Sequence, residues 1–379
     1  MPKHKKHKMR FYSLICLGLL TVFSCATYKI YPRKPATTMN WQVFAANPAR
    51  TGEVHSSIRL PLEKLWVKQP ASAVGNALIA VDSMLYFGTI DGRIYAVEMN
   101  GGKKRLHKKL SIECTCAYGS ERIIIARRYR KKTLYSLNLL TNKYDWQIDA
   151  GDIASEPLVT ADWIYVASLY KHIDRYRLDT GAKTWRFNTE ALLHSSPALC
   201  DSILVVGSDD GTVYALDAVT GKLVWKYRTG GCIYAAPVIA NDMVYVGSFD
   251  NQMYAIDLRT GQLKWKFATG GKIYPSGAAS ADVIVFGSND YHVYCLNALT
   301  GRLKWKAGAK SIITTSPAIS NGIVFIGSAD HHYYGFDLHS GEELWKFETK
   351  GRVRTSPIIW GDYLLGASEN YYLYAFKSK

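Results

Sequence analysis

The sequence lacks any apolar run long enough to cross a membrane as a helix. Its longest such stretch, Phe11 to Phe23, follows a start, Met1 to Arg10, that has five basic residues and no acidic one. A membrane-spanning helix needs about 20 apolar residues. A basic start followed by a short apolar stretch is typical of a secretory signal peptide. We therefore expect residues 1–24 to be a signal peptide rather than a permanent anchor.

The end of the apolar stretch predicts a covalent lipid. The residues Val22-Phe23-Ser24-Cys25 resemble a bacterial lipobox, in which the cysteine is lipidated. Ordinary signal cleavage nearby is the alternative. Ala26 after the cysteine permits sorting to the outer membrane, so we expect a cell-envelope protein anchored by a lipid on Cys25 and facing the periplasm.

The cysteines lack the spacing of a disulfide framework or a metal site. Apart from Cys16 and Cys25, five remain, an odd number without regular spacing: Cys114, Cys116, Cys200, Cys232 and Cys295. Cys114 and Cys116 fall on one face of a predicted strand, but no His or Cys pair lies near them to complete a zinc site. We expect no metal and no disulfide framework.

Catalytic motifs are also lacking. The chain has no phosphate-binding glycine loop, no nucleophile elbow and no metal-ligand spacing. His331 and His332 are adjacent in a predicted turn, where their side chains diverge. Four aspartates recur at a regular step, which indicates turn chemistry: Asp209, Asp250, Asp290 and Asp330. We therefore expect no enzyme activity, no catalytic residue and no cofactor.

Acidic residues are fewer than basic ones. The net charge of +16 falls to +11 once the five basic residues of the leader are removed. Two clusters, Lys103–Lys109 and Arg127–Lys132, contribute much of the excess. A basic surface favours an acidic partner or an anionic lipid surface, or it keeps exposed strand edges apart. Nucleic acid is not expected for an exported protein.

What the sequence does contain is a repeat of about 40 residues. It is marked by seven tryptophans: Trp66, Trp146, Trp185, Trp225, Trp265, Trp305 and Trp345. The single doubled gap holds Leu106 where a tryptophan is expected, so there are eight copies. Tyrosines recur in parallel, at positions 95, 135, 176, 214, 254, 294, 334 and 374.

Each repeat predicts four short strands. Runs rich in Val, Tyr, Ile and Leu are separated by Asp-Gly and Thr-Gly turns, most clearly between Ser196 and Lys226. A four-stranded unit of this length is one propeller blade. Asp217 and Gly221 have the residue types that a tight turn needs. Each tryptophan is expected to cover the gap between blades, with its indole N–H on a carbonyl.

The two chain ends predict how the ring closes. The last repeat ends without its tryptophan strand, and Lys64 to Lys68 supplies one near the start. We therefore expect an all-β, eight-bladed β-propeller of four-stranded antiparallel blades over residues 63–379, closed by pairing N- and C-terminal strands. Residues 25–62 form a tether and lead-in whose Trp41, Phe44, Asn47, Arg50, Thr51 and Gly52 pack against one face.

The repeat Tyr-Ala-Leu-Asp-x-x-Thr-Gly-x-x-x-Trp-Lys, at Tyr214 to Lys226, resembles that of quinoprotein-type (PQQ-like) propellers. The opening Trp41-x-x-Phe44-x-x-Asn47-x-x-Arg50-Thr51-Gly52 is similar to the start of that family. Its quinone dehydrogenases add long insertions, a calcium-binding cluster and adjacent cysteines, and this sequence has no Cys-Cys pair. The other branch, BamB-like outer-membrane protein assembly lipoproteins, matches in length, blade count and leader.

The second branch implies a non-catalytic scaffold that binds a protein of the barrel-assembly machinery and helps outer-membrane β-barrels to insert. In it, loops that lead into innermost strands contact the partner. The corresponding candidates here are Leu192, Leu193, His194, Arg352 and Arg354. Leu192 and Leu193 serving only to cover a blade core is the alternative for that pair. A monomeric propeller that binds another protein, polysaccharide or small ligand in its funnel is the second hypothesis, and a quinone-dependent dehydrogenase is the third.

Overall fold

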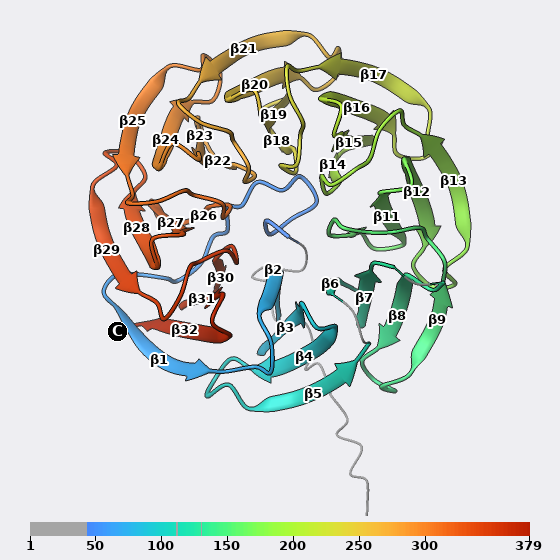
Figure 1. Ribbon diagram of the computed structural model, residues 1–379, viewed down its shortest axis with the longest axis horizontal. Helices are drawn as coiled ribbons and strands as arrows, with labels where there is room; N and C mark the ends of the chain where they lie inside the picture. Colours follow the sequence, from blue (N-terminus) through green and yellow to red (C-terminus); the bar gives the residue numbers. More distant parts are fainter. Residues whose placement is uncertain (1–43, 111–112, 130) are drawn as a thin grey trace, which may run out of the picture.

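The computed structural model describes residues 44–110, 113–129 and 131–379. The proposed signal peptide, Cys25 and Trp41 lie outside this part. The described residues form eight four-stranded antiparallel sheets around one axis (Figure 1), so the predicted all-β propeller is confirmed. Within those ranges no helix is long or apolar enough to span a bilayer.

The sheets are numbered here as blades 1 to 8, and each is given with its innermost strand first. Blade 1 is β2 (Val74–Val81), β3 (Met84–Thr89), β4 (Arg93–Glu98) and β5 (Lys104–Lys109), and blade 2 is β6 (Cys114–Gly119), β7 (Arg122–Arg127), β8 (Leu134–Asn138) and β9 (Tyr144–Ile148). Blade 3 is β10 (Leu158–Val159), β11 (Trp163–Ser168), β12 (His172–Arg177) and β13 (Lys183–Asn188), and blade 4 is β14 (Ala198–Cys200), β15 (Ile203–Gly207), β16 (Thr212–Asp217) and β17 (Leu223–Arg228). Blade 5 is β18 (Val238–Ala240), β19 (Met243–Gly247), β20 (Gln252–Asp257) and β21 (Leu263–Ala268), and blade 6 is β22 (Ala278–Ser280), β23 (Val283–Gly287), β24 (His292–Asn297) and β25 (Leu303–Gly308). Blade 7 is β26 (Ala318–Ser320), β27 (Ile323–Ser328), β28 (His332–Asp337) and β29 (Glu343–Glu348), and blade 8 is β30 (Ile358–Trp360), β31 (Tyr363–Ser368), β32 (Tyr372–Ser378) and β1 (Leu62–Lys68).

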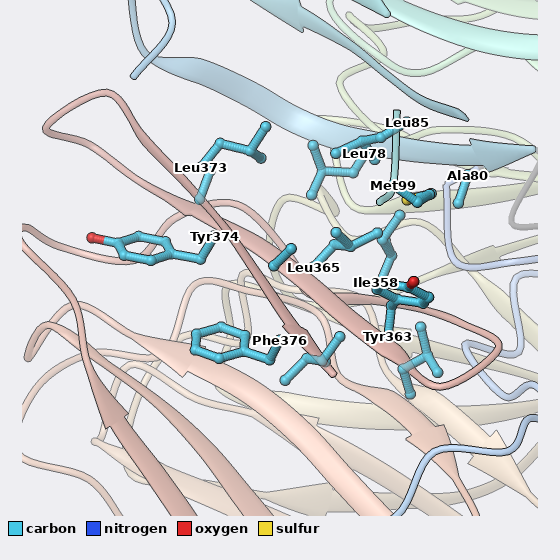
Figure 2. Close-up of a cluster of buried hydrophobic side chains, with 14 of the residues drawn as sticks. Leu78, Ala80, Leu85, Met99, Ile358, Tyr363, Leu365, Leu373, Tyr374 and Phe376 are labelled. Carbon is cyan, nitrogen blue, oxygen red and sulfur yellow. The ribbon is translucent and has the colours of Figure 1, made fainter. Parts of the chain in front are cut away.

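Blade 8 joins the two ends of the chain, as the sequence predicts. β1 pairs antiparallel with β32, with Trp66 opposite Ala375 and Val67 opposite Tyr374. An apolar core that includes Leu78, Ile358 and Phe376, all at most 2% exposed, fills the contact between blades 8 and 1 (Figure 2). Because the closing strand comes from the start of the chain, the ring forms only when both ends are in place.

Indole N–H groups join each blade to the next one along the chain. Six tryptophan Nε1 atoms donate to a backbone carbonyl of the following blade: Trp66 to Met99 (2.7 Å), Trp146 to Leu178 (3.0 Å), Trp185 to Ala218 (3.2 Å), Trp225 to Leu258 (2.7 Å), Trp265 to Ala298 (2.9 Å) and Trp305 to Leu338 (2.8 Å). Trp345 instead packs edge-on against Phe376, with ring centroids 5.3 Å apart. Leu106 is buried at the position that lacks an indole.

The turn glycine of each Thr-Gly pair has a second role, which the sequence did not reveal. Gly261 has a φ of +71°, and a Cβ added there would lie 2.7 Å from the indole of Trp225 in the preceding blade. Backbone conformation and contact both exclude a larger residue. The glycine therefore lets the indole of one blade lie flat under the turn of the next.

Replacing Gly261 by alanine should lower the free energy of unfolding by about 2 kcal/mol, because strain at positive φ and the clash with Trp225 add. Gly322 is a matched control, since its φ is +72° and nothing lies within 4 Å of an added Cβ. We expect Gly322→Ala to cost about 1 kcal/mol, from strain alone. Urea unfolding measures both, and equal losses would mean that the indole contact adds nothing.

Two aligned positions read from the sequence were wrong. Opposite the tryptophan of the outermost strand, blade 3 has Arg175 where blade 4 has Ala215. Asp174, not Tyr176, therefore occupies the place of the recurring tyrosine Tyr214. A 41-residue spacing hid this, because a tyrosine happens to lie two residues further on.

The recurring aspartate of blade 4 is Asp210 rather than Asp209. Its Oδ1 accepts the N–H of Thr212, just as Asp250 accepts that of Gln252. The same bond recurs in blades 6 and 7, where Asp290 and Asp330 accept from the residue two positions on. These four carboxylates thus belong to turns, and Asp209 is released for another contact.

The lead-in segment, residues 44–61, runs through the axial opening rather than over one face (Figure 1). Four of its carbonyls accept N–H groups from the innermost strands of blades 4 to 7. The pairs are Pro48 with Leu199 (2.8 Å), Ala49 with Ile239 (2.8 Å), Thr51 with Ala279 (2.7 Å) and Gly52 with Ile319 (2.9 Å). One extended segment therefore closes the inner edges of four consecutive sheets.

Arg50 is fully buried in this segment. Its Nε donates to the carbonyl of Pro197 (2.6 Å), one terminal nitrogen to Phe44 (2.8 Å) and the other to Glu156 (3.4 Å). Burial lowers the pKa of the guanidinium to about 10, so it remains a cation at neutral pH. The arginine thus ties the lead-in to blades 3 and 4.

Candidate functional site

One end of the ring collects two kinds of loop from every blade. Because the four strands alternate in direction, the loop that leads into each innermost strand lies at the same end as the hairpin between the second and third strands. Hydrogen bonds join these loops and hairpins, as from Asp209 N to the Leu192 carbonyl (3.0 Å) and from Ala329 N to that of Ile312 (3.0 Å). We call this end the axial mouth and the first kind of loop the inner loops.

A pocket of about 120 Å³ lies at the centre of the axial mouth, above Phe44 of the lead-in. Serine hydroxyls join its successive inner loops. Ser276 accepts the N–H of Ala236 (2.8 Å), Ser316 that of Ser276 (3.1 Å), Ser356 that of Ser316 (2.9 Å) and Ser196 that of Glu156 (3.0 Å). This bonding fixes the inner loops relative to one another, so the pocket is preformed.

Aromatic rings form one wall of the pocket. His194 stacks on Tyr234 with centroids 4.5 Å apart, and Tyr274 lies edge-on to Tyr234 at 5.8 Å. Nδ1 of His194 lies 2.9 Å from the carboxylate of Asp209, which fixes the imidazole ring. Burial raises the pKa of the Tyr234 phenol. The wall can stack against a planar or apolar group and keeps its hydroxyls as hydrogen-bond donors.

The pocket also has one acid and one base. The carboxylate of Glu156 accepts a hydrogen bond from Ser196 Oγ (2.5 Å), and Arg354 pairs through Nε with Glu369. Both charges reach Tyr274, whose pKa is raised first by burial, raised further by Glu156 and lowered by Arg354. Stacking, hydrogen-bonding and ion-pairing groups therefore converge here, as in a binding site for a polar or peptide ligand.

A second hollow, of about 450 Å³, lies beside the pocket, between the loops of blades 6, 7 and 8. Its lining includes Lys310, His331, Arg352 and Arg354, and Arg354 borders both spaces. We call this hollow the basic groove. It makes one side of the axial mouth cationic.

The predicted partner-binding residues are only partly brought together. His194 and Arg354 line the central pocket, Arg352 lines the basic groove, and Leu192 is 39% exposed beside them. Leu193 is fully buried in the core between blades 3 and 4, so the prediction that it contacts a partner is wrong and its role is packing. Sequence reasoning missed Glu156 and Tyr274, although the recurring Ser-Pro step marks the inner loops.

The other predicted features lie away from the mouth or inside the blades. Cys114 and Cys116 are buried in β6, where burial raises the pKa of the Cys114 thiol to about 12. The first basic cluster includes the outermost strand β5, and the second forms the hairpin after β7, of which residue 130 is outside the described part. Cys25 is also outside it. The tryptophans belong to the outermost strands.

The donor set does not fit a protein-bound metal. Across the described ranges, no three His, Cys, Asp or Glu side chains are grouped so that they could hold an ion. All five cysteines there are unpaired thiols. The residues therefore do not match the calcium cluster and adjacent cysteines of the quinone dehydrogenases.

Solved structures of similar fold belong to proteins of different function. BamB from Moraxella catarrhalis has a TM-score of 0.72 at 19% identity, covering 84% of this chain and 100% of its own. A europium-containing methanol dehydrogenase has a TM-score of 0.75 at 13% identity, covering 90% and 98%. The computationally designed Ika8 protein has a TM-score of 0.75 at 18% identity, covering 83% and 99%. At these identities the likeness shows the fold alone.

The fold and its axial mouth define a PQQ-like β-propeller built around preformed binding loops. A sequence profile described as outer membrane protein assembly factor BamB matches residues 170–288 and 269–378, more than half of the chain. The chain belongs to this family. No curated protein matches it.

Proposed function

We propose that the protein is a non-catalytic scaffold of the cell envelope that assists the assembly of outer-membrane β-barrel proteins. The family match supports this role most strongly. In this proposal residues 1–24 are removed as a signal peptide, Cys25 carries the lipid that anchors the chain to the outer membrane, and residues 63–379 form the working domain.

The axial mouth is the proposed contact surface for a protein of the barrel-assembly machinery. It presents one exposed aliphatic residue, Leu192, next to His194, Tyr234 and Tyr274, on loops held by the serine hydrogen bonds. Aromatic and arginine side chains in a partly enclosed centre are the usual anchors of protein interfaces. The donor set gives no support to a quinone enzyme, so binding is the role that the site suits.

The alternative is a smaller ligand in the central pocket. A carboxylate, a guanidinium and stacked phenol rings around about 120 Å³ suit a polar molecule such as a sugar unit of a polysaccharide. This alternative and the scaffold role share a surface but differ in what is captured.

Photo-cross-linking in intact cells tests the scaffold role. A benzoylphenylalanine at position 192 should cross-link to the barrel-assembly protein, because Leu192 borders the pocket. The matched control is position 299, where Leu299 is 57% exposed in a turn at the opposite end of blade 6. We also expect Leu192→Asp to reduce co-capture at least tenfold, since loss of an interface anchor costs 1 to 2 kcal/mol or more.

Recovery of the same adduct from both positions, or of none from position 192, would contradict the proposal. An adduct to glycan instead of protein would favour the alternative. Thermal unfolding of Leu192→Asp serves as the control for folding, because its side chain is exposed and its loss should leave the melting temperature unchanged.

A further inference from the structure

Three neighbouring hairpin tips on the axial mouth carry rings in a backbone conformation that disfavours them. Tyr291, His331 and Tyr371, in blades 6, 7 and 8, have φ values of +73°, +72° and +66°. The same tip is Gly211 in blade 4 and Asn251 in blade 5. Glycine and asparagine adopt this region readily, whereas bulky residues there are outliers that often mark function.

The fold itself does not need these rings. The tip carbonyl accepts an N–H from the end of the outermost strand in each blade, from Ala309 to Tyr291 (2.7 Å) and from Thr349 to His331 (2.7 Å). Gly211 makes the same bond with Thr229 (2.8 Å) without a side chain. Tyr291 and Tyr371 remain 49% and 45% exposed. The strained tips therefore present their rings to whatever approaches the mouth.

Unpaired cations lie between the three tips. Among the described residues, the side chains of Lys310, Lys350 and Arg352 have no acidic partner within ion-pair distance. Arg354 is paired with Glu369. Lys310 and Arg352 border the basic groove of about 450 Å³.

The acidic residue that borders the groove is already committed. Asp330 accepts hydrogen bonds from the hydroxyl of Tyr334 (2.6 Å), the backbone N–H of Lys310 (2.8 Å) and that of His332 (3.1 Å), and its side chain is only 6% exposed. It cannot turn outward to neutralise the groove. The positive charge there is thus available to a ligand.

The opposite side of the mouth is acidic. Glu156 borders the central pocket, and Asp152, Glu190 and Asp209 come from the loops and hairpins of blades 3 and 4. Such a division of charge orients a bound chain, because acidic side chains are attracted to one side and repelled from the other.

We propose that the basic groove binds an acidic, extended segment of a partner protein. Arg352 and Lys310 hold carboxylates, arginine through paired N–H donors, while Tyr291, His331 and Tyr371 contact the backbone and apolar parts between them. A concave groove between raised tips suits a chain better than a flat bilayer. The inference deepens the proposed scaffold role by giving the chemistry of one partner segment, but the groove is testable without that partner.

The test uses the purified full chain and a fluorescein-labelled peptide of alternating glutamate and glycine. Fluorescence polarisation should detect binding that weakens as salt rises. The double variant Lys310→Glu/Arg352→Glu should weaken binding at least tenfold. Lys222→Glu/Arg302→Glu is the matched control: it makes the same charge change at two exposed residues in turns of blades 4 and 6, at the opposite end of the ring. It should change binding less than twofold.

A second variant separates binding from folding. His331→Gly relieves the positive φ, so its melting temperature should not fall, whereas its affinity for the peptide should fall about threefold. Absence of peptide binding to the unmodified chain, or equal loss in both charge variants, would overturn the proposal. Binding to phosphatidylglycerol vesicles that is lost in Lys310→Glu/Arg352→Glu, with peptide binding intact, would overturn it in favour of a lipid surface.

The outcome is independent of the scaffold test. Failure of cross-linking at position 192 with groove-dependent peptide binding intact would remove the barrel-assembly role and leave the groove. Cross-linking at 192 without peptide binding would do the reverse.

Discussion

Replacing Arg186 by methionine is expected to lower the free energy of unfolding by about 3 kcal/mol, because it leaves a buried carboxylate without its cation. Asp174 is fully buried in blade 3. Arg186 donates to both of its oxygens, at 2.7 and 2.6 Å, and the Tyr176 hydroxyl donates to one, at 2.6 Å. The value is near the low end for such pairs, since the Arg186 side chain is itself 37% exposed.

The neighbouring blade supplies the control. Lys226 faces Tyr214 in blade 4 as Arg186 faces Asp174 in blade 3. Its ion pair with Glu190 is exposed on both sides, so Lys226→Met should change stability by less than about 0.5 kcal/mol. Chemical denaturation of both variants at pH 7 measures the difference. A similar small loss in both would show that the buried carboxylate finds another partner.

His172 adds a pH dependence to this test. Its pKa is lowered chiefly by burial, and Arg186 lowers it further while Asp174 raises it. Removing Arg186 therefore favours the protonated imidazole in the folded state. A raised folded pKa contributes stability that is present at low pH and lost as pH rises. The deficit of Arg186→Met should accordingly be smaller at pH 5 than at pH 8.

Replacing Arg50 by methionine should lower the free energy of unfolding by about 3 kcal/mol. Methionine fills similar space but donates no hydrogen bond, and unmet buried carbonyls cost about 1 to 3 kcal/mol each. Three carbonyls lose a donor, those of Phe44, Glu156 and Pro197. Relief from burying a charge offsets part of this loss.

Hydrogen exchange should localise the effect of Arg50→Met. The amides of Leu199, Ile239, Ala279 and Ile319 donate to the lead-in, so they should exchange faster if the segment loosens. Arg59→Met is the control, since Arg59 is exposed in the same segment and its side chain has no printed role in the axial bonding. Unchanged exchange at these four amides would show that the backbone pairing alone holds the lead-in.

The architecture was predictable because the repeat is local. Each blade needs the same turn residues and the same indole every 40 residues, so the 80-residue gap around Leu106 could still be counted as two blades. The contact of Gly261 with Trp225 was not predictable, because it joins two blades whose packing angle no local pattern contains.

The mouth was predictable only in part. The 40-residue step identifies which loops lead into innermost strands, and so it found His194 and Arg354. It could not separate exposed Leu192 from buried Leu193, because adjacent residues of an irregular loop have no fixed periodicity. Asp174 was missed for a related reason, since a tyrosine two residues away preserved the apparent spacing.

By itself the sequence determined the number of blades, the strands in each and the join between the chain ends, since these follow from short-range turn chemistry and regular spacing. Only the tertiary structure decided that the lead-in passes through the axis, that Arg50 and Asp174 are buried with their partners, and that unpaired cations and strained rings gather on one side of the mouth. Those features arise between blades, where residues far apart in the chain meet.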